Sequence, residues 1–427
     1  MPSDARWKSI EPVTAQATAT EQEALSLLTA QAVRSGARQM LELGVRDGLA
    51  HFTIGIDRLE NVADAVLAVM RRSYPSLKIP FHARWRHFVL GGVDRWAAHA
   101  ESVSWSDRAA RGRAEFDLAI VSVLLDAGAG TMWRYRDRMS GQGIGRSEGL
   151  ALASLDMFAS GAFSSDARDP FRVDADVIAK FPLALLQDGF QVADANPLVG
   201  FDGRADLLRN LGRLVSERPQ VFASHDRPRP GGLFDHLAAK AKDGAIAAPT
   251  ILFEVLVQLG PIWPSRLELA GIPLGDCWRH PSIRAAGATD GLVPLHKLSQ
   301  WLTYSLIEPL ERAGIGVTDI DGLTGLAEYR NGGLFIDHDV LRLRHPEDAD
   351  RSHDIGSPLV VEWRALTVAL LDLLAERIRS RLGRSRVSLP LASLLEGGTW
   401  AAGRAAAFET RADGAPPIKV VSDGTVF

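Results

Sequence analysis

The sequence predicts a mostly α-helical fold. Apolar residues recur at spacings of three and four along most of the chain, which is the period of an amphipathic helix. Alternation with a period of two, which marks strands, is scarce. Strands also do not alternate regularly with helices, as they would in a doubly wound α/β sheet. We therefore expect a multi-helical body with a short β-hairpin and a C-terminal extension.

The helical segments can be justified in chain order. Thr20 and Glu23 have the spacing of a capping box ahead of the first helix. Asp57 precedes a second helix whose apolar residues share one face. Residues 296–312 and 360–382 carry the same amphipathic pattern. These four segments predict the framework of the fold.

The extended elements and the domain limits follow from the remaining pattern. Residues 334–343 predict a short hairpin, and residues 418–420 predict one strand. The chain becomes richer in glycine, alanine and arginine near its end but finishes on apolar residues. We expect a helical body over 1–385, with two lobes meeting near 185–200, and an extension over 386–427 packed on that body.

Composition narrows the classes of function. The chain has 427 residues, 46% of them apolar, which is enough for one large core or two fused ones. A net charge of -4 lacks the basic excess of a nucleic-acid binder. Cys277 is the only cysteine, so a reducing compartment is expected. The N-terminus has no apolar signal-peptide core, and the apolar segment 245–264 is interrupted by Glu254 and three prolines. These features predict a cytoplasmic protein with no membrane or nucleic-acid partner.

The densest polar run lies in residues 325–334. Glu328, Tyr329, Arg330 and Asn331 are consecutive and are followed by two glycines. This pattern predicts a helix that ends inside a cleft, where the glycines permit a left-handed turn or a close backbone approach. Glu328 is then a general base or electrostatic stabiliser, with Arg330 as its orienting partner. The alternative is a structural ion pair that ties the helix end to a hairpin.

A second polar and aromatic run contains Arg86, His87, Asp94, Arg95 and Trp96. Aromatic walls and arginine forks around a carboxylate suit a polar ligand with a flat face, such as a ureido group, a base or a sugar phosphate. The same residues also suit a stacked Arg-Trp surface that buttresses two helices. The sequence leaves both interpretations open.

Two shorter motifs complete the candidates. Residues 145–149 match the G-x-S-x-G nucleophile elbow, but no apolar strand precedes them. Ser147 is expected instead as a helix N-cap, and Arg146 beside this helix start predicts an anion site for a phosphate. Trp278 lies in a turn at 275–281 that either lines the same cleft or only closes a loop. The eleven histidines include no HExxH motif, so we expect no metal or other cofactor.

Several long motifs resemble those of one known family. They are RWRHF, GGVDRW, GRSEGLALAS, NPLVGFDGRADLLRNLG, GDCWRHP, HKLSQWLTYSLIEPL, EYRNGGLF and SDGTVF. Together they resemble the uracil-catabolism family formed by the fourth protein of the URC pathway. The resemblance implies a role in uracil breakdown, downstream of a ring-opening enzyme related to GTP cyclohydrolase II. Ribosylurea or its phosphate is the intermediate associated with that route.

A more distant resemblance supplies a mechanism. Queuosine-nucleotide salvage N-glycohydrolases, helical proteins with a DNA-glycosylase-like fold, carry an Asp-Tyr-Arg motif followed by a helix with a Glu-x-Arg pattern. The order here is similar, with Glu328 in place of the aspartate and a later pair, Glu362 and Arg364. The resemblance implies a DNA-glycosylase-like body. It also implies a second carboxylate in the site, for which Asp94 is the counterpart.

Chemistry and resemblance together predict hydrolysis of the N-glycosidic bond of ribosylurea or its 5-phosphate, with urea as the leaving group. Such a reaction develops positive charge on the ribose, so Glu328 and Asp94 are the predicted catalytic carboxylates. Tyr329, Arg330, Asn331, Trp96, Arg95, His87, Trp278 and Ser147 are predicted to bind the substrate, and Arg86 or Arg146 its phosphate. The Phe427 carboxylate either closes the cleft or belongs to a packed terminus.

Two other classes of function stay open. A metal-dependent amidohydrolase would act on the ureido group itself. A non-catalytic partner would channel the ring-opened product and would contact other enzymes of the pathway.

Overall fold

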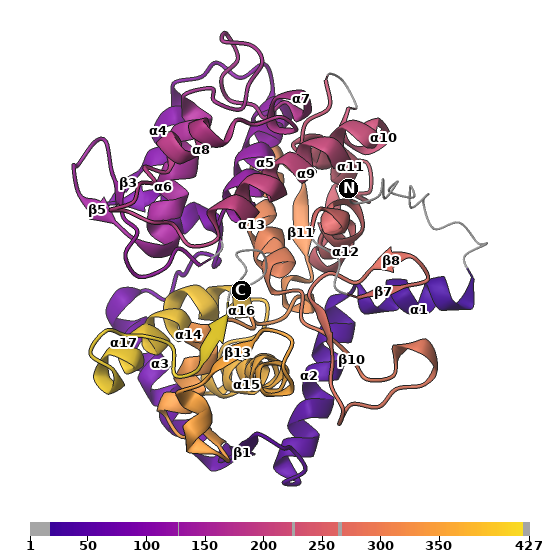
Figure 1. The fold of residues 1–427 in the computed structure, drawn as a ribbon, viewed down its shortest axis with the longest axis vertical. Coiled ribbons are helices and arrows are strands. Elements are labelled where there is room, and N and C mark those ends of the chain that lie inside the picture. The colour runs from indigo at the N-terminus through magenta and orange to yellow at the C-terminus, as the bar shows by residue number, and fades with distance from the viewer. Residues whose placement is uncertain (1–17, 127, 224–226, 264–266, 422–427) are drawn as a thin grey trace.

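The computed structural model describes residues 18–126, 128–223, 227–263 and 267–421. Most of these residues are helical, and every strand among them is only two or three residues long. The predicted mostly α-helical fold is therefore confirmed (Figure 1). Within these segments no helix combines the length and apolar character needed to cross a membrane.

The helices account for most of the described chain. The α-helices are α1 (Ala19–Leu27), α2 (Ala30–Val45), α3 (Leu59–Ser73), α4 (Arg95–Glu101), α5 (Arg108–Leu124), α6 (Arg146–Ala159), α7 (Ala175–Ile178), α8 (Leu183–Gly189), α9 (Phe201–Glu217), α10 (Pro219–Phe222), α11 (Gly232–Ala238), α12 (Ala248–Leu259), α13 (Lys297–Ala313), α14 (Tyr329–Asp337), α15 (Pro358–Leu382), α16 (Leu391–Leu394) and α17 (Trp400–Thr410). Short 3-10 helices cover Ile56–Arg58, Arg84–Phe88, Gly260–Ile262, Gly287–Thr289, Ile320–Gly322 and Pro346–Ala349, and a π-helix at Leu395–Thr399 joins α16 to α17.

The strands of the described segments pair only in twos. The antiparallel pairs are β1 (Phe52–Ile54) with β12 (Leu341–Leu343), β2 (Val89–Leu90) with β3 (Val93–Asp94), β4 (Tyr135–Arg136) with β5 (Gly143–Ile144), β7 (Glu268–Leu269) with β8 (Ile272–Pro273), and β9 (Cys277–Arg279) with β10 (Leu292–Pro294). The parallel pairs are β6 (Ala245–Ala247) with β11 (Gly316–Thr318), and β13 (Ser352–Asp354) with β14 (Lys419–Val421). These pairs fasten loops to the helical body.

The predicted β elements have different outcomes. The hairpin expected at residues 334–343 is wrong in its place, because α14 runs to Asp337 and β12 pairs with the distant β1. Short hairpins form elsewhere, for example between β2 and β3. The strand expected at 418–420 is confirmed as β14, which pairs in parallel with β13. A period-two pattern this short does not identify its partner.

Helix starts also differ in detail from the prediction. Thr18, not Thr20, caps α1, and it forms the capping box with Glu21: the Glu21 amide donates to Thr18 Oγ1 at 3.2 Å. Two overlapping matches to the capping pattern lie two residues apart here, and the helix begins at the earlier one. Asp57 lies in a 3-10 turn, so α3 begins only at Leu59.

Segments far apart in the sequence pack side by side. Near the two ends of the described chain, α2 and α3 pack against α15, and α17 packs against α3 and α14 (Figure 1). Contacts of α9 with α5 and α7 join the segments before and after residues 185–200. The body is therefore built from long-range contacts between helices.

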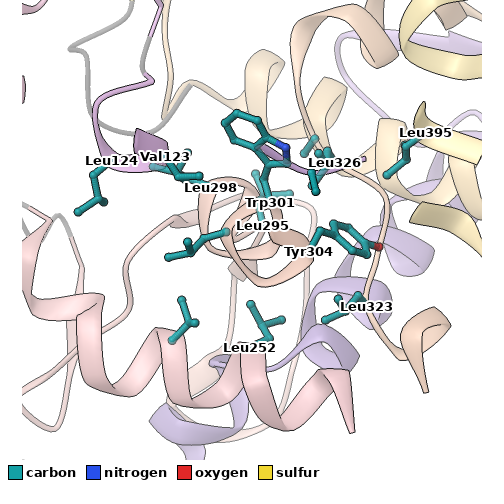
Figure 2. Packing of buried hydrophobic residues seen from close by; sticks show 14 of the residues in the cluster. Val123, Leu124, Leu252, Leu295, Leu298, Trp301, Tyr304, Leu323, Leu326 and Leu395 are labelled. Carbon is teal, nitrogen blue, oxygen red and sulfur yellow. The ribbon is translucent and has the colours of Figure 1, made fainter. Parts of the chain in front are cut away.

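The central helix is α13, which is buried along most of its length. It packs against α5 and α12. Figure 2 shows Leu298, Trp301 and Tyr304 of α13 among apolar side chains of these neighbours, including Leu124 and Leu252. Because α13 is held on several sides, its first residues are fixed in position, and these residues face the cavity described next.

Candidate active site

A cavity of about 450 Å³ lies where the starts of α6, α13, α14 and α17 meet the loop after α5 and the C-terminal segment 413–420. Its wall holds three carboxylates, Asp126, Glu328 and Asp413, together with Lys297 and His87. A larger cavity of about 810 Å³ lies between residues 76–81 and 384–393, but its lining in the described chain includes no histidine and no tryptophan. The smaller cavity is therefore the candidate active site.

Glu328 is the N-cap of α14. Its carboxylate accepts hydrogen bonds from the backbone amides of Arg330 at 2.8 Å and Asn331 at 2.7 Å. The predicted helix end at this run is wrong, because α14 begins at Tyr329. A helix N-terminus favours negative charge, and both amides fix the orientation of the carboxylate. Glu328 is thus a half-buried carboxylate that two backbone amides hold in one orientation at the cavity wall.

The glycines of this run allow close packing inside α14. A Cβ atom added to Gly332 would lie 2.6 Å from Nε1 of Trp363, which is closer than real Cβ contacts come. The predicted close backbone approach is therefore confirmed at Gly332, whereas the left-handed turn is not adopted. Asn331 lies behind the cavity wall, where its Nδ2 donates to the Leu326 carbonyl at 3.4 Å.

Arg330 contacts an aromatic ring instead of Glu328. Its guanidinium carbon lies 3.9 Å from the centroid of the Trp400 ring, and its Nε donates to the Tyr329 hydroxyl at 3.3 Å. Within the described segments no ion pair joins it to Glu328, so neither the orienting role nor the structural ion pair suggested by the sequence is realised. The side chain of Arg330 is buried, and its Nη1 has no hydrogen-bond partner among these residues.

The second carboxylate of the cavity is Asp126, just after α5. Its Oδ2 accepts from Ser147 Oγ at 3.0 Å and lies 3.2 Å from Nη1 of the buried Arg84. Its Oδ1 is buried with no hydrogen-bond partner in the described chain. Burial raises the pKa of Asp126, against the opposing charges of Arg84 and Lys297 and the Ser147 hydrogen bond. Asp126 therefore holds a proton more readily than an ordinary aspartate.

Lys297, the first residue of α13, lines the same cavity. Burial lowers the pKa of its ammonium, and the nearby charges of Glu328 and Asp126 oppose that shift. The ammonium also lies 6.0 Å from the centroid of the Trp301 ring. Lys297 thus interacts electrostatically with both Glu328 and Asp126.

The buried ion pair between Asp276 and Arg364 holds the backbone of Lys297 in place. The backbone amide of Lys297 donates to Asp276 Oδ2 at 3.0 Å, and Arg364 donates to both oxygens of Asp276, at 2.8 and 2.7 Å. Trp278 Nε1 donates to Asp276 Oδ1 at 2.7 Å. Burial raises the pKa of Asp276, but the charge and hydrogen bonds of Arg364 outweigh it and lower the value to about 2. Trp278 therefore supports the site from behind and does not line the cavity.

His87 lies against the wall formed by Trp301 and Trp400, with ring centroids 5.6 and 6.2 Å away. Its Nδ1 lies 3.3 Å from Arg84 Nη1. A guanidinium only donates, so Nδ1 accepts and the proton is on Nε2. Burial, and then the charge of Arg84, place the pKa of His87 well below its usual range. His87 is therefore a neutral imidazole in the cavity wall.

Other predicted residues lie outside the cavity. Asp94 is an exposed N-cap of α4 that accepts from the Ala97 amide at 2.9 Å, so the structure does not bring it to Glu328. Trp96 is buried in the core and donates to Glu115 Oε1 at 3.0 Å. Arg95 pairs with Asp137 and Arg86 with Glu308, at 3.2 and 2.7 Å. For Arg86, Arg95 and Trp96 the alternative interpretation from the sequence holds, because their side chains support helices and do not line the cavity.

The start of α6 does reach the cavity. Gly145, not Ser147, occupies the N-cap position, and α6 begins at Arg146. The Ser147 hydroxyl is directed to Asp126 instead, so the predicted N-cap is wrong. Arg146 has a φ of 57°, an uncommon conformation for a residue with a Cβ atom. Arg146 and Ser147 both line the cavity.

Sequence reasoning missed Asp126, Lys297 and Trp400. Asp126 has a weak signal in the glycines that follow it. The lysine at 297 begins a strongly apolar helix with a tryptophan one turn later, which is a stronger signal. Trp400 carries no motif at all. Among the described residues, no group of three or more His, Cys, Asp or Glu side chains is arranged to hold a metal ion.

The fold and the cavity define an α-helical protein with a cavity lined by charged and aromatic side chains. The chain belongs to the family described as "Protein of unknown function (DUF1688)", which matches residues 26–427. It is 39% identical over 413 residues to "Protein urg3" of Schizosaccharomyces pombe, covering 94% of this chain and 98% of that protein. It is 38% identical over 409 residues to "Uracil catabolism protein 4" of Lachancea kluyveri, covering 88% of this chain and 92% of that protein.

Proposed function

We propose that this protein acts in uracil catabolism and hydrolyses the N-glycosidic bond of ribosylurea or its 5-phosphate. The name of the Lachancea kluyveri relative supports the pathway. One observation carries the reaction: Glu328, a carboxylate fixed as the N-cap of α14, shares a cavity with Asp126, a buried carboxylate whose pKa is raised by burial. Glycoside hydrolysis uses a pair of carboxyl groups, one acting as a general acid and the other in its ionised form.

We assign Glu328 to stabilise the positive charge that develops on the ribose. As the C1′–N bond lengthens, the ribose becomes oxocarbenium-like, and a fixed anion stabilises that state without reorganising. The two amide hydrogen bonds hold the Glu328 oxygens in place before substrate binds. The remaining lone pairs are free to accept a proton from the attacking water.

We assign Asp126 as the general acid that protonates the leaving group. The electron pair of the C1′–N bond passes to the urea nitrogen, which takes the proton of Asp126. Water oxygen bonds to C1′ and gives a proton to Glu328, so urea and ribose, or ribose 5-phosphate, are released. Return of that proton from Glu328 to Asp126 through solvent restores the site. Lys297, which interacts with both carboxylates, stabilises whichever one is ionised.

We assign substrate binding to the aromatic wall of the cavity. Trp301, Trp400 and the neutral His87 form a surface of closely spaced rings. Such a surface suits the flat ureido group and the apolar face of a ribose. Because His87 is neutral, it adds no positive charge beside the developing cation.

The test is product analysis with purified protein on ribosylurea and on ribosylurea 5-phosphate. Wild type should release urea and a reducing sugar, and Glu328→Gln should lower kcat about 100-fold or more. Glu347→Gln, in an exposed 3-10 turn, is the matched control and should keep full activity. Release of ammonia in place of urea would identify an amidohydrolase. No product from either compound would leave the channelling role.

A further inference from the structure

We infer that Arg330 and Arg146, with the first turn of α6, form a subsite for a phosphate monoester, so that the substrate is phosphorylated. This inference rests on the proposed function and selects one of its two substrates. It also moves the phosphate away from Arg86, whose charge is already matched by Glu308 at 2.7 Å.

Arg330 carries most of the argument. Only 7% of its surface is exposed, yet within the described segments no carboxylate pairs with it and its Nη1 has no hydrogen-bond partner. The Trp400 ring, 3.9 Å away, covers one face of the guanidinium and leaves its edge available. A buried cation without a counter-ion is costly, and native proteins rarely keep one without a reason. An anionic ligand group supplies the missing partner.

Arg146 brings a second cation to the same space. Arg146 and Arg330 line the 450 Å³ cavity together, and both also line a small pocket that adjoins it. Among the described residues no ion pair engages Arg146. Arg404, an exposed residue that also lines the small pocket, faces Glu148 instead, with Nη1 3.7 Å from Oε1. The acidic residue in the first turn of α6 is therefore directed to Arg404.

The start of α6 adds backbone donors. Its N-cap is Gly145, so no side chain caps the first amides, and Ser147 in that turn faces the cavity. Uncapped amides at a helix N-terminus bind anions. This position lacks its own cap and is flanked by Arg146.

The anion that fits best is a phosphate monoester. A phosphate carries about -1.5 to -2 charges and three strong acceptor oxygens. Two guanidinium groups and a helix N-terminus match that charge and number of acceptors better than a carboxylate. The two carboxylates assigned to the reaction line the same cavity. A substrate with phosphate at one end and a glycosidic bond at the other therefore spans both groups.

The binding test needs no turnover. Isothermal titration calorimetry would compare ribose 5-phosphate with ribose on wild type and on Arg330→Met, Arg146→Met and Arg38→Met. Wild type should bind the phosphate at least about 100-fold more tightly, and each of the first two substitutions should cost about 10- to 100-fold. Arg38→Met, which removes an exposed charge on α2, should change binding less than about threefold. Equal binding of both sugars by wild type, or an equal loss in all three variants, would overturn the subsite.

Hydrolysis kinetics on the two substrates distinguish this inference from the proposed function. Hydrolysis of ribosylurea 5-phosphate with kcat/KM about 100-fold above that of ribosylurea, lost in Arg330→Met, supports both. Equal hydrolysis of the two substrates removes the subsite and leaves the reaction. Tight binding of ribose 5-phosphate without hydrolysis of either compound keeps the subsite and removes the reaction. Arg330→Lys, which keeps the charge but loses the fork, should recover only part of the preference.

Discussion

The guanidinium carbon of Arg330 lies 3.9 Å from the centroid of the Trp400 ring, so the first turn of α14 is stacked on the first residue of α17. A segment predicted as a packed extension therefore contributes directly to the cavity. The ring holds the guanidinium without neutralising it, which leaves its charge available to a ligand.

Removing that ring should weaken phosphate binding without removing a charge. We expect Trp400→Leu to lower the affinity for ribose 5-phosphate about 5- to 30-fold, because Arg330 loses the surface that orients it. Calorimetry would measure the change. Phe408→Leu, on an exposed position of the same helix, is the control and should bind like wild type. Unchanged binding by Trp400→Leu would show that the stacking has no role in the site.

The raised pKa of Asp126 has a signature in the pH profile. An acid acts only while protonated, so kcat should fall as pH rises through the pKa of Asp126. Ser147 donates to the ionised carboxylate and thereby opposes the rise. We expect Ser147→Ala to move the fall in kcat to higher pH, and Asp126→Asn to abolish it with kcat reduced about 100-fold or more.

The control for this profile is Ser160→Ala, at the other end of α6, whose hydroxyl donates only to a carbonyl of its own helix. Its profile should match that of wild type. An alkaline limb that stays in place in both Ser147→Ala and Asp126→Asn would assign the acid to another group.

Lys297 should matter for catalysis and little for stability. Because burial already disfavours its charged form, Lys297→Met replaces a costly cation with an apolar side chain of similar length. We expect kcat to fall about 100-fold with a Tm equal to or above that of wild type. Differential scanning calorimetry and urea release would measure the two effects. A large loss of Tm would make Lys297 a structural residue.

Asp276 should contribute stability that depends on pH. Its pKa is about 2 in the folded protein, below the ordinary value of 3.8, so its stabilising effect is present above about pH 4 and is lost as pH falls toward 2. We expect Asp276→Asn to cost about 3–5 kcal/mol at pH 7, because Arg364 loses its buried partner. The difference from wild type should shrink in urea unfolding at pH 3. Asp354→Asn, exposed on β13, should show no such trend.

Gly332 should tolerate no larger side chain. Gly332→Ala places a methyl group against the indole of Trp363, so α14 must shift, and we expect a loss of about 1–3 kcal/mol. Gly260→Ala is the matched control, because a Cβ atom there meets no neighbour within 4 Å. Equal urea midpoints for wild type and Gly332→Ala would show that the helix yields at no cost.

Much of the helical body could be predicted, because amphipathic periodicity is a local property. The pattern at 360–382 corresponds closely to α15, and the pattern at 296–312 to α13. The hairpin at 334–343 could not be predicted, since β12 finds its partner β1 almost three hundred residues earlier. Pairing over that distance leaves no local signal.

The site was predicted in part for the same reason. The run from Glu328 to Arg330 and the helix start at Arg146 line the cavity, whereas Asp94 is an exposed N-cap of α4 outside it. Asp126 and Lys297 were missed, because their roles arise only when the end of α5 meets the start of α13. A carboxylate and a lysine that are 171 positions apart carry no spacing rule.

The segment 413–420 forms part of the cavity wall and is held there by the parallel pairing of β14 with β13. During synthesis on the ribosome, every other part of the wall is made before this one. A nascent chain that has emerged only through α15 therefore lacks this part of the wall, which is completed when β14 pairs with β13. A chain interrupted directly after α15 contains every described helix up to α15 but lacks α17 and the segment 413–420, which both line the cavity.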